Sequence, residues 1–375
     1  MRRPRRRART PGCRGFEPDL SLAALQSQVQ DAAARGAALR IRGGGSKDFY
    51  GNPARGELLD TRAVAGIVSY EPSELVVTAR GGTPLAELEE ALAARGQFLS
   101  FEPPHHGAGA TLGGCVAAGL SGPRRASAGA VRDAILGAKI VDGRGELLAF
   151  GGQVMKNVAG YDVSRFLAGS LGTLGVIVEA SLKVLPRPAA ERTLRFALPQ
   201  AEAIARLNAW GGQPLPLSAS AWHSGALHVR LSGAESALRA AAAKMGGEAV
   251  AEAEAASLWA ALREQTHAYF SGDAPLWRLS VPPVTAPLVP IQGQAGEPLL
   301  EWGGALRWIR GNLDAAAVRA AAAAAGGHAT LYRGADKSAG AFTPLSPLAA
   351  RLHRDLKKAF DPAGILNPGR LYPEL

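Results

Sequence analysis

The chain has 375 residues, of which 47% are hydrophobic, and this is enough for roughly two or three domains of ordinary size. Its formal net charge is +10, but residues 1–15 hold seven arginines and no acidic residue, so the remainder carries only +3. A nucleic-acid partner is therefore not expected for the folded part. No run of 18 or more apolar residues occurs, which argues against a transmembrane helix and favours a cytoplasmic protein.

The arginine-rich start is not followed by the apolar stretch that a secretory signal requires. We interpret residues 1–16 as a disordered basic tail, and a tail that binds polyanions is the functional alternative. The two cysteines, Cys13 and Cys115, cannot form a disulfide framework or supply the four ligands of an iron–sulfur cluster. Redox chemistry would therefore need another carrier, and no metal site is predicted.

The first half of the chain mixes helices and strands. Apolar spacing and capping residues predict a helix with Ser21 as its N-cap, and a second helix with Thr83 as its N-cap and Pro84 at its first position. Strands are predicted over 38–42, 67–70, 75–79, 137–141 and 146–150, and the turn 142–145 closes a hairpin between the last two. Residues 176–184 alternate apolar and polar positions, which predicts a half-buried strand.

The prolines at 186 and 188 mark a domain boundary, after which the composition changes. Alanine-rich helices such as 234–244 and 315–325 stand between short strands such as 226–231 and 305–309, which predicts a second, smaller α+β lobe. Ser346 then caps a C-terminal helix with Pro347 in its first turn, and turn signals follow at 361–364 and 367–369.

Three glycine-rich segments together predict a bound dinucleotide: RGGGS at Arg42–Ser46, TLGGCVAAGLSG at Thr111–Gly122 and GSLGTLG at Gly169–Gly175. Glycine lets backbone N–H groups approach a pyrophosphate closely and adopt the dihedral angles that this needs. Each segment alone has a structural alternative, which is a simple turn for the first and close packing of a helix on a sheet for the second. The presence of all three segments in one chain favours dinucleotide binding over these structural alternatives.

Two other nucleotide-binding motifs are excluded or disfavoured. The chain has no Gly-Lys dipeptide, so a Walker A phosphate loop is absent. Residues 107–113 have a superficial Rossmann pattern, but the spacing is one residue too long and Pro103–His106 precede it instead of a strand.

These segments resemble the motifs of the FAD-linked oxidases of the vanillyl-alcohol oxidase type, whose cofactor domain is called the PCMH-type FAD-binding domain. The matching motifs are RGGGSK, ATLGGCVAAGLSG, GYDVSRFLAGSLGTLGVI and the closing FDPAGILNPGR. Within the family, the chain is most similar to the FAD-binding E subunits of bacterial glycolate oxidases, through IRGGGSKDFYG, FEPPHHGAGATLGG, MKNVAGYDVSRFLAGSLGTLGVI and LEWGGALRW.

The resemblance implies an α+β fold in which a PCMH-type FAD-binding domain of two α+β subdomains is followed by a smaller, shortened α+β cap domain. We place the FAD-binding domain at 17–188, the cap domain at 189–340, and a C-terminal segment that returns to the FAD domain at 341–375. The whole resemblance spans about residues 20–373.

By the same resemblance, Arg42–Lys47 would hold the pyrophosphate, Thr111–Gly114 and Gly119–Gly122 would line the other side of the cofactor, and Gly172–Ile177 would bind toward the adenosine. The cofactor-binding residues implied are Arg42, Gly43, Gly44, Gly45, Ser46, Lys47, Thr111, Leu112, Gly113, Gly114, Gly119, Ser121, Gly122, Gly172, Thr173, Gly175, Val176 and Ile177. Some relatives attach flavin through a histidine at the position of Ser46, so we predict non-covalent FAD.

The function implied is that of an FAD-binding subunit in a complex that oxidises glycolate to glyoxylate. Its partners would be a second FAD-binding subunit and an iron–sulfur subunit, and any contact with the inner membrane would come through them. The alternatives are a self-sufficient flavin dehydrogenase for another 2-hydroxy acid or polyol, and a subunit whose FAD is structural.

No catalytic residue is assigned from the sequence. Oxidation of a hydroxy acid needs a base and a cation for the carboxylate. The second lobe offers as bases His223, His228, His267 and His328, and as cations Arg230, Arg278, Arg307 and Arg333. Self-sufficient relatives carry a Glu-His-Gly-type segment where this chain has residues 331–337, which argues against independent catalysis. His105 and His106 are interpreted as loop residues because two prolines precede them.

Overall fold

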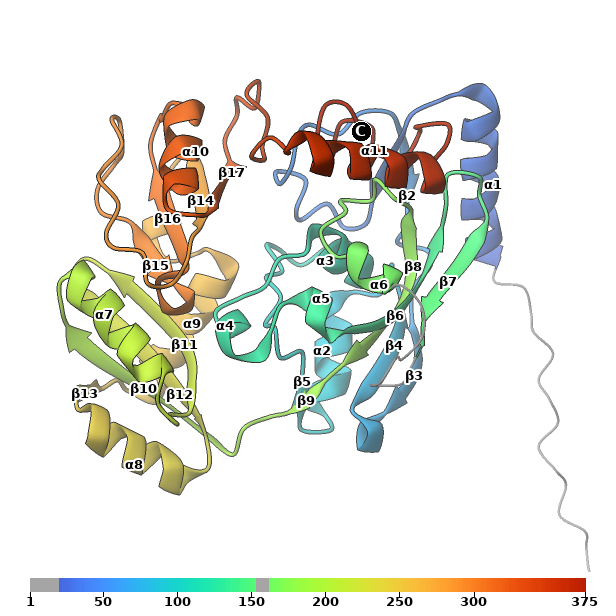
Figure 1. Cartoon of the computed structure of the whole chain (residues 1–375). Coiled ribbons are helices and arrows are strands. Elements are labelled where there is room, and N and C mark those ends of the chain that lie inside the picture. The colour runs from blue at the N-terminus through green and yellow to red at the C-terminus, as the bar shows by residue number, and fades with distance from the viewer. Residues whose placement is uncertain (1–19, 153–161) are drawn as a thin grey trace, which may run out of the picture.

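The computed structural model describes residues 20–152 and 162–375, and within them it forms two lobes (Figure 1). The predicted basic tail and the MKNVAGY part of the third motif, residues 155–161, lie outside the described residues. The elements of the first lobe are α1 (Leu20–Arg35), β1 (Leu39–Arg42), β2 (Glu57–Asp60), β3 (Ile67–Glu71), η1 (Pro72–Glu74), β4 (Val76–Arg80), α2 (Leu85–Ala93), β5 (Gln97–Phe98), α3 (Leu112–Ala118), α4 (Arg125–Ala128), α5 (Val131–Ala134), β6 (Ile135–Val141), β7 (Leu147–Gly151), α6 (Val163–Phe166), β8 (Val176–Lys183) and β9 (Leu185–Pro186).

A five-stranded antiparallel sheet in the order β3-β4-β8-β6-β7 is the centre of this lobe. The prediction that residues 176–184 form a half-buried strand was wrong, because β8 is the middle strand and its residues are buried on both faces up to Leu182. Its polar positions are satisfied by neighbouring strands instead of water. Ser181 Oγ lies 2.8 Å from Thr78 Oγ1, and Glu179 pairs with Arg80 at 3.1 Å.

The parallel pair β1–β2 is separate from this sheet and packs under α1. Leu22, Leu25 and Val29 recur at helical spacing and are buried against Leu39 and Leu59, as the apolar pattern predicts. Two predicted caps were wrong. Ser21 lies within α1, which already includes Leu20. The Thr83 hydroxyl does not cap α2 but exchanges hydrogen bonds with the backbone of Gly66, at 2.9 and 3.1 Å, and Pro84 occupies the N-cap position.

The second lobe is an eight-stranded sheet in the order β13-β10-β12-β11-β15-β16-β14-β17, with each pair antiparallel. Its elements are β10 (Ala190–Ala197), α7 (Gln200–Gly211), β11 (Leu217–His223), β12 (Ala226–Gly233), α8 (Glu235–Met245), β13 (Glu248–Ala249), α9 (Glu252–Glu264), η2 (Ala268–Phe270), β14 (Leu276–Ser280), β15 (Leu299–Glu301), η3 (Trp302–Gly304), β16 (Leu306–Arg310), α10 (Ala315–Ala324) and β17 (His328–Arg333). The predicted α+β fold is confirmed.

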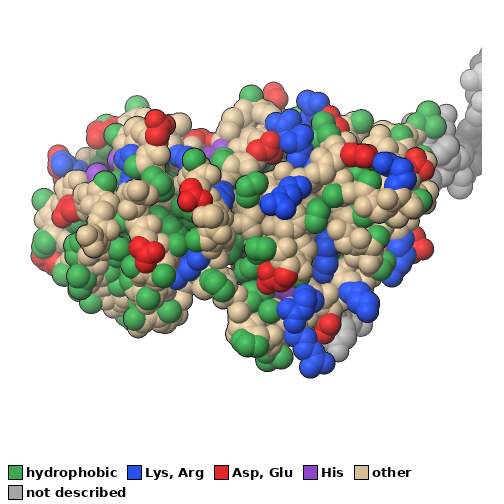
Figure 2. All heavy atoms as spheres, turned by 90° about the horizontal axis from the view of Figure 1, so that it is seen from above, with side chains coloured by type: hydrophobic (Ala, Val, Ile, Leu, Met, Phe, Trp, Pro, Cys, Tyr) green, Lys and Arg blue, Asp and Glu red, His purple; other side chains and the backbone are tan. Residues whose placement is uncertain are grey.

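The two lobes share an apolar core. Helices α7, α8 and α10 cover one face of the large sheet, while the other face packs on α9 and on Tyr50, Leu120 and Leu171 of the first lobe. Viewed from above, the lobes meet along a hollow, and on the visible face of the first lobe basic side chains are interspersed with acidic ones (Figure 2). No helix among the described residues is long and apolar enough to cross a membrane.

The last helix, α11 (Pro347–Phe360), returns the chain from the second lobe to the first (Figure 1). Ser346 caps it as predicted, since its hydroxyl accepts a hydrogen bond from the N–H of Ala349. Near its end, the Lys357 ammonium pairs with Asp361 at 2.7 Å and also donates to the carbonyls of Thr173 and Leu366. Both side chains are buried, so this ion pair attaches the helix to the third glycine segment.

Replacing Lys357 by Met should lower the free energy of unfolding by about 3–5 kcal/mol, because the Asp361 carboxylate would stay buried without its cation. Urea denaturation followed by circular dichroism measures this. The exposed neighbour Lys358 provides the control, since Lys358→Met should change the unfolding free energy by less than about 0.5 kcal/mol. Equal stability of the two variants would contradict the assignment.

Candidate functional site

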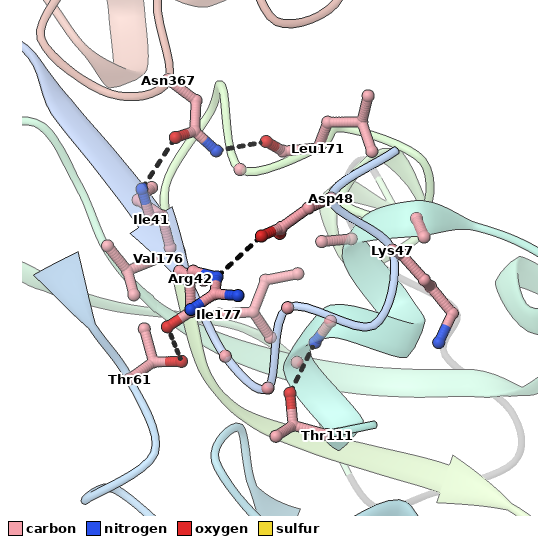
Figure 3. Close-up of a pocket in the computed structure, with 18 of the residues that line it drawn as sticks. Ile41, Arg42, Lys47, Asp48, Thr61, Thr111, Leu171, Val176, Ile177 and Asn367 are labelled. Atoms are coloured by element: carbon pink, nitrogen blue, oxygen red, sulfur yellow. Dashed lines mark hydrogen bonds and ion pairs between the residues drawn. The ribbon is translucent and has the colours of Figure 1, made fainter. Parts of the chain in front are cut away.

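The three glycine segments, far apart in the sequence, meet around one cavity in the first lobe (Figure 3). The first segment follows β1, the second forms the start of α3, and the third leads into β8. The C-terminal segment closes the cavity. Its lining consists of Ile41, Arg42, Gly43, Gly44, Gly45, Ser46, Lys47, Asp48, Thr61, Thr111, Gly113, Gly114, Ala117, Ala118, Leu171, Gly172, Gly175, Val176, Ile177, Asn367 and Arg370.

The loop after β1 presents backbone donors to this cavity. Within the described part of the chain, the N–H groups of residues 44–47 have no hydrogen-bond acceptor, although all four residues line the cavity. Unpaired N–H groups that are removed from water are costly, and a ligand rich in oxygen atoms would satisfy them. The loop also needs Gly44 for its packing, because a Cβ there would lie 1.4 Å from the carbonyl oxygen of Gly109.

Two cations flank the loop, but both already have partners. The Arg42 guanidinium is paired with Asp48 at 2.7 Å. The Lys47 ammonium donates to the carbonyl of His105 at 3.2 Å, and burial lowers its pKa. Backbone N–H groups, more than these side chains, are therefore the donors that the loop offers to an anion.

In the second glycine segment, some residues pack the helix on the sheet and others leave space at the cavity. At Gly113, the N–H donates to the carbonyl of Gly81, and a Cβ would lie 3.0 Å from that oxygen and 3.1 Å from the carbonyl oxygen of Ile177. This supports the alternative of close helix-on-sheet packing for Gly113. At Gly114, a Cβ would meet only the Thr111 hydroxyl within 4 Å, so this residue leaves space beside the cavity. Thr111 itself caps α3.

Asn367 of the C-terminal segment joins the first and third glycine segments. Its side-chain oxygen accepts a hydrogen bond from the N–H of Ile41 at 2.8 Å, and its Nδ2 donates to the carbonyl of Leu171 at 2.6 Å (Figure 3). Arg370 adds bonds to the carbonyls of Asn52 and Asp48. The sequence indicated only a turn at Asn367, although the residue lies in the closing FDPAGILNPGR motif.

Most of the predicted cofactor-binding residues line the cavity, and five lie elsewhere. Leu112 is in the hydrophobic core, and Gly119 ends α3 with φ of 67° against Gly169. The Thr173 hydroxyl donates to the carbonyl of Ser170. Ser121 and Gly122 line a different, small cavity at the interface of the lobes. The residues that the sequence missed are Ile41, Asp48, Thr61, Ala117, Ala118, Leu171, Asn367 and Arg370.

A cleft of ≈ 670 Å³ lies between the lobes and begins at Ser46, which also lines the first cavity. We call it the interlobe cleft; its lining is Ser46, Phe49, His105, His106, Gly107, Ala108, Arg263, Glu264, Thr266 and Arg333. His106 also lines the small cavity behind the cleft, together with Tyr332, Arg278 and Glu301. Burial raises the pKa of the Glu301 carboxyl to about 7, although Trp308 donates a hydrogen bond to it.

The candidate groups proposed from the second lobe are mostly placed elsewhere. Neither cavity nor the cleft is lined by His223, His228, His267 or His328. Arg230 is a structural residue that bonds both carboxylate oxygens of Glu102, at 2.8 and 3.0 Å, and so ties the lobes together. Arg307 donates to carbonyls of its own lobe. Arg278 lines the small cavity and Arg333 lines the interlobe cleft, and His106 lies in a loop that lines both.

Comparisons with known proteins show which family this arrangement belongs to. Residues 21–151 match the family model described as "FAD binding domain", and residues 317–371 match "FAD linked oxidases, C-terminal domain". The chain is 48% identical over 352 residues to the glycolate oxidase subunit GlcE of Escherichia coli, covering 94% of this chain and 97% of that one. The chain belongs to the family of FAD-linked oxidases. The predicted family and FAD-binding domain are thereby confirmed.

More distant members of the family match smaller parts. The glycolate oxidase subunit GlcD of Bacillus subtilis is 32% identical over 34% of this chain and 27% of its own length. The D-2-hydroxyglutarate dehydrogenase of Xanthomonas citri pv. viticola is 32% identical over 48% of this chain and 38% of its own length. A solved structure of alkyldihydroxyacetonephosphate synthase has the same fold, with a TM-score of 0.63 at 16% identity over 92% of this chain and 74% of that chain.

Asn367→Asp should separate the first and third glycine segments. The variant keeps the acceptor for Ile41 but places a carboxylate oxygen against the carbonyl of Leu171, where Nδ2 now donates. We expect the free energy of unfolding to fall by about 1–3 kcal/mol and FAD to bind more weakly. Denaturation and a fluorescence titration with FAD measure the two effects.

The control for this change is Asn208→Asp in the second lobe, where the amide also donates to backbone carbonyls, those of Ile204 and Pro283. It should lower stability without changing the dissociation constant for FAD. If Asn367→Asp leaves that constant unchanged as well, Asn367 serves the fold alone.

Proposed function

We propose that this chain is the FAD-binding subunit of a complex that oxidises glycolate to glyoxylate. The observation that carries the proposal is the 48% identity to a glycolate oxidase subunit over nearly the full length of both chains. The cavity formed by the three glycine segments supports it, because its unpaired N–H groups suit a pyrophosphate.

The residues proposed to hold FAD are those of the predicted set that line the cavity, with Asn367 fixing the loops around it. The N–H groups of Gly44, Gly45 and Ser46 would bind the pyrophosphate. Gly172, Val176 and Ile177 lie on the side proposed for the adenosine. When bound, FAD supplies the two-electron acceptor for alcohol oxidation. Ser46 stands where some relatives carry the histidine that attaches flavin, so we propose that the cofactor is held without a covalent bond.

Two partners complete the proposal: a second FAD-binding subunit, and an iron–sulfur subunit that receives the electrons. The match to GlcD supports a relative of that kind as the first partner. Any four-cysteine cluster in the complex would belong to the second partner, because this chain has only two cysteines. Peripheral contact with the inner membrane would come through these partners.

Gly114→Ala tests whether the cavity holds the cofactor. Alanine at this helical position should stabilise the protein without FAD by about 0.5–1 kcal/mol, since its Cβ meets only the Thr111 hydroxyl, at 3.2 Å. The same Cβ should crowd the bound cofactor and weaken FAD binding by about 1–3 kcal/mol. Gly211→Ala, at the end of α7 with nothing within 4 Å, is the control and should leave FAD affinity unchanged. Unchanged affinity in both variants would remove α3 from the site.

The complex itself is tested by purifying the tagged chain from its own host. We expect flavin to be released into the supernatant on acid precipitation, and two further proteins, one flavin-binding and one cysteine-rich, to copurify. The preparation should reduce an artificial electron acceptor when glycolate is added. A flavin-free preparation that remains flavin-free after FAD is supplied would refute the cofactor assignment, and a flavin-containing one without glycolate-dependent reduction would refute the substrate.

A further inference from the structure

His106 lies where the two lobes and the proposed cofactor site meet. It lines the interlobe cleft with Ser46, which also lines the cavity proposed for FAD, and it lines the small cavity with Tyr332 as well. Its Nε2 lies 3.0 Å from the hydroxyl of Tyr332 on β17. A titratable ring is thus held beside the cofactor site by a residue of the opposite lobe.

The backbone around His106 is held in a sparsely populated conformation. Its φ is 53°, which is unusual for a residue with a side chain. The N–H groups of His105 and His106 both donate to the carboxylate of Glu264, at 3.0 and 2.9 Å, so the second lobe fixes the loop. Phe49 packs edge-on against the ring at 5.3 Å. Strain retained by such contacts is common at functional sites.

The hydrogen bond to Tyr332 determines which ring nitrogen can accept a proton. If the His106 Nε2–H donates to the Tyr332 oxygen, the lone pair is on Nδ1, for which no hydrogen-bond partner exists among the described residues. Burial is the main cause that lowers the pKa of His106 to about 4, and nearby Lys47 and Arg333 lower it further, against the opposing effect of Glu264. The ring is therefore neutral near pH 7, and one of its nitrogens carries a free lone pair.

Arg333 supplies a cation on the same wall of the cleft. It is the next residue after Tyr332, and its guanidinium lies over the Phe49 ring at 5.2 Å and donates one hydrogen bond to Gln265. A guanidinium recognises a carboxylate through paired N–H donors. A neutral base and a cation that can bind a carboxylate thus line the same cleft, and together they suit a small 2-hydroxy carboxylate.

We propose that this chain itself oxidises a small 2-hydroxy carboxylate in the interlobe cleft, with His106 Nδ1 as the base for the hydroxyl proton and Arg333 binding the carboxylate. Tyr332 is the positioning residue that holds the ring. In the step, the O–H bond breaks and its proton passes to Nδ1, while the C–H bond at the same carbon breaks and its hydride passes to FAD. The alcohol becomes a carbonyl and FAD is reduced by two electrons, so the inference rests on the function proposed above.

The test uses the full chain loaded with FAD, mixed with glycolate without oxygen, and follows flavin bleaching by stopped-flow absorbance. His106→Gln keeps an N–H donor for Tyr332 but cannot take up a proton, so bleaching should slow by about 10²–10⁴-fold at unchanged flavin content. His228→Gln is the matched control. His228 on β12 lines neither the two cavities nor the cleft, so its replacement should leave the bleaching rate unchanged.

A second readout does not depend on turnover. Oxalate, an unreactive acid of the same size, should bind the FAD-loaded chain with a calorimetric signal that Arg333→Gln weakens at least tenfold and His106→Gln leaves intact. The pH profile of bleaching should be flat from about pH 5 to pH 8 in the wild type and fall toward pH 4 as His106 is protonated. Tyr332→Phe should lower the bleaching rate at saturating glycolate while leaving the affinity for oxalate unchanged.

The outcomes separate this inference from the proposed function. Equal bleaching of His106→Gln and wild type would overturn the role of His106, and a wild-type chain that binds FAD but is not bleached by glycolate would overturn catalysis by this chain. Both results leave cofactor binding standing. Failure to bind FAD would overturn the proposed function and this inference together.

Discussion

The close approach of backbone segments that are far apart in the sequence is the constraint on which the rest of the structure depends. The loop after β1 lies so near the 107–111 loop that a Cβ on Gly44 would overlap the carbonyl of Gly109. Gly172 lies close to the Asn367 side chain, because a Cβ there would be 2.8 Å from its Nδ2. Glycine permits these approaches but does not hold the segments together. Asn367 holds the first and third segments together, because its amide bonds to Ile41 and to Leu171.

The C-terminal segment thus completes the lining of a cavity that is otherwise formed by the first half of the chain. The buried Lys357–Asp361 pair fixes α11 on the carbonyls of Thr173 and Leu366, and this places Asn367 between the first and third segments. Asp361 also accepts hydrogen bonds from two N–H groups of the following turn. The chain forms the whole second lobe before its C-terminal segment completes the cavity in the first lobe. This connectivity couples the folding of the two lobes.

The sequence predicted what depends on local pattern. The hairpin at 142–145 and the Ser346 cap are each encoded within a few residues, and each lies where expected. The three glycine segments meet at one cavity, although Gly119, Ser121 and Gly122 of the second lie outside its lining. Asn367 was missed because its partner Ile41 is 326 residues away, and a turn signal carries no information about such a contact. The half-buried strand predicted for residues 176–184 was wrong for a related reason. Alternation of apolar and polar residues predicts a solvent-exposed face only when the polar side chains lack buried partners, and Ser181 has such a partner in Thr78.

The sequence offered histidines of the second lobe as candidate bases. The base that we propose, His106, lies instead in a proline-flanked loop of the first lobe. What distinguishes His106 is a pair of contacts that only the tertiary fold supplies, Glu264 on its backbone and Tyr332 on its ring. Tyr332 belongs to the 331–337 segment, where self-sufficient relatives were expected to carry a histidine. The cavity proposed for FAD is lined only by the first lobe and its returning segment, whereas the interlobe cleft is lined by both lobes. The proposed cofactor binding and the proposed substrate chemistry therefore depend on separate sets of contacts.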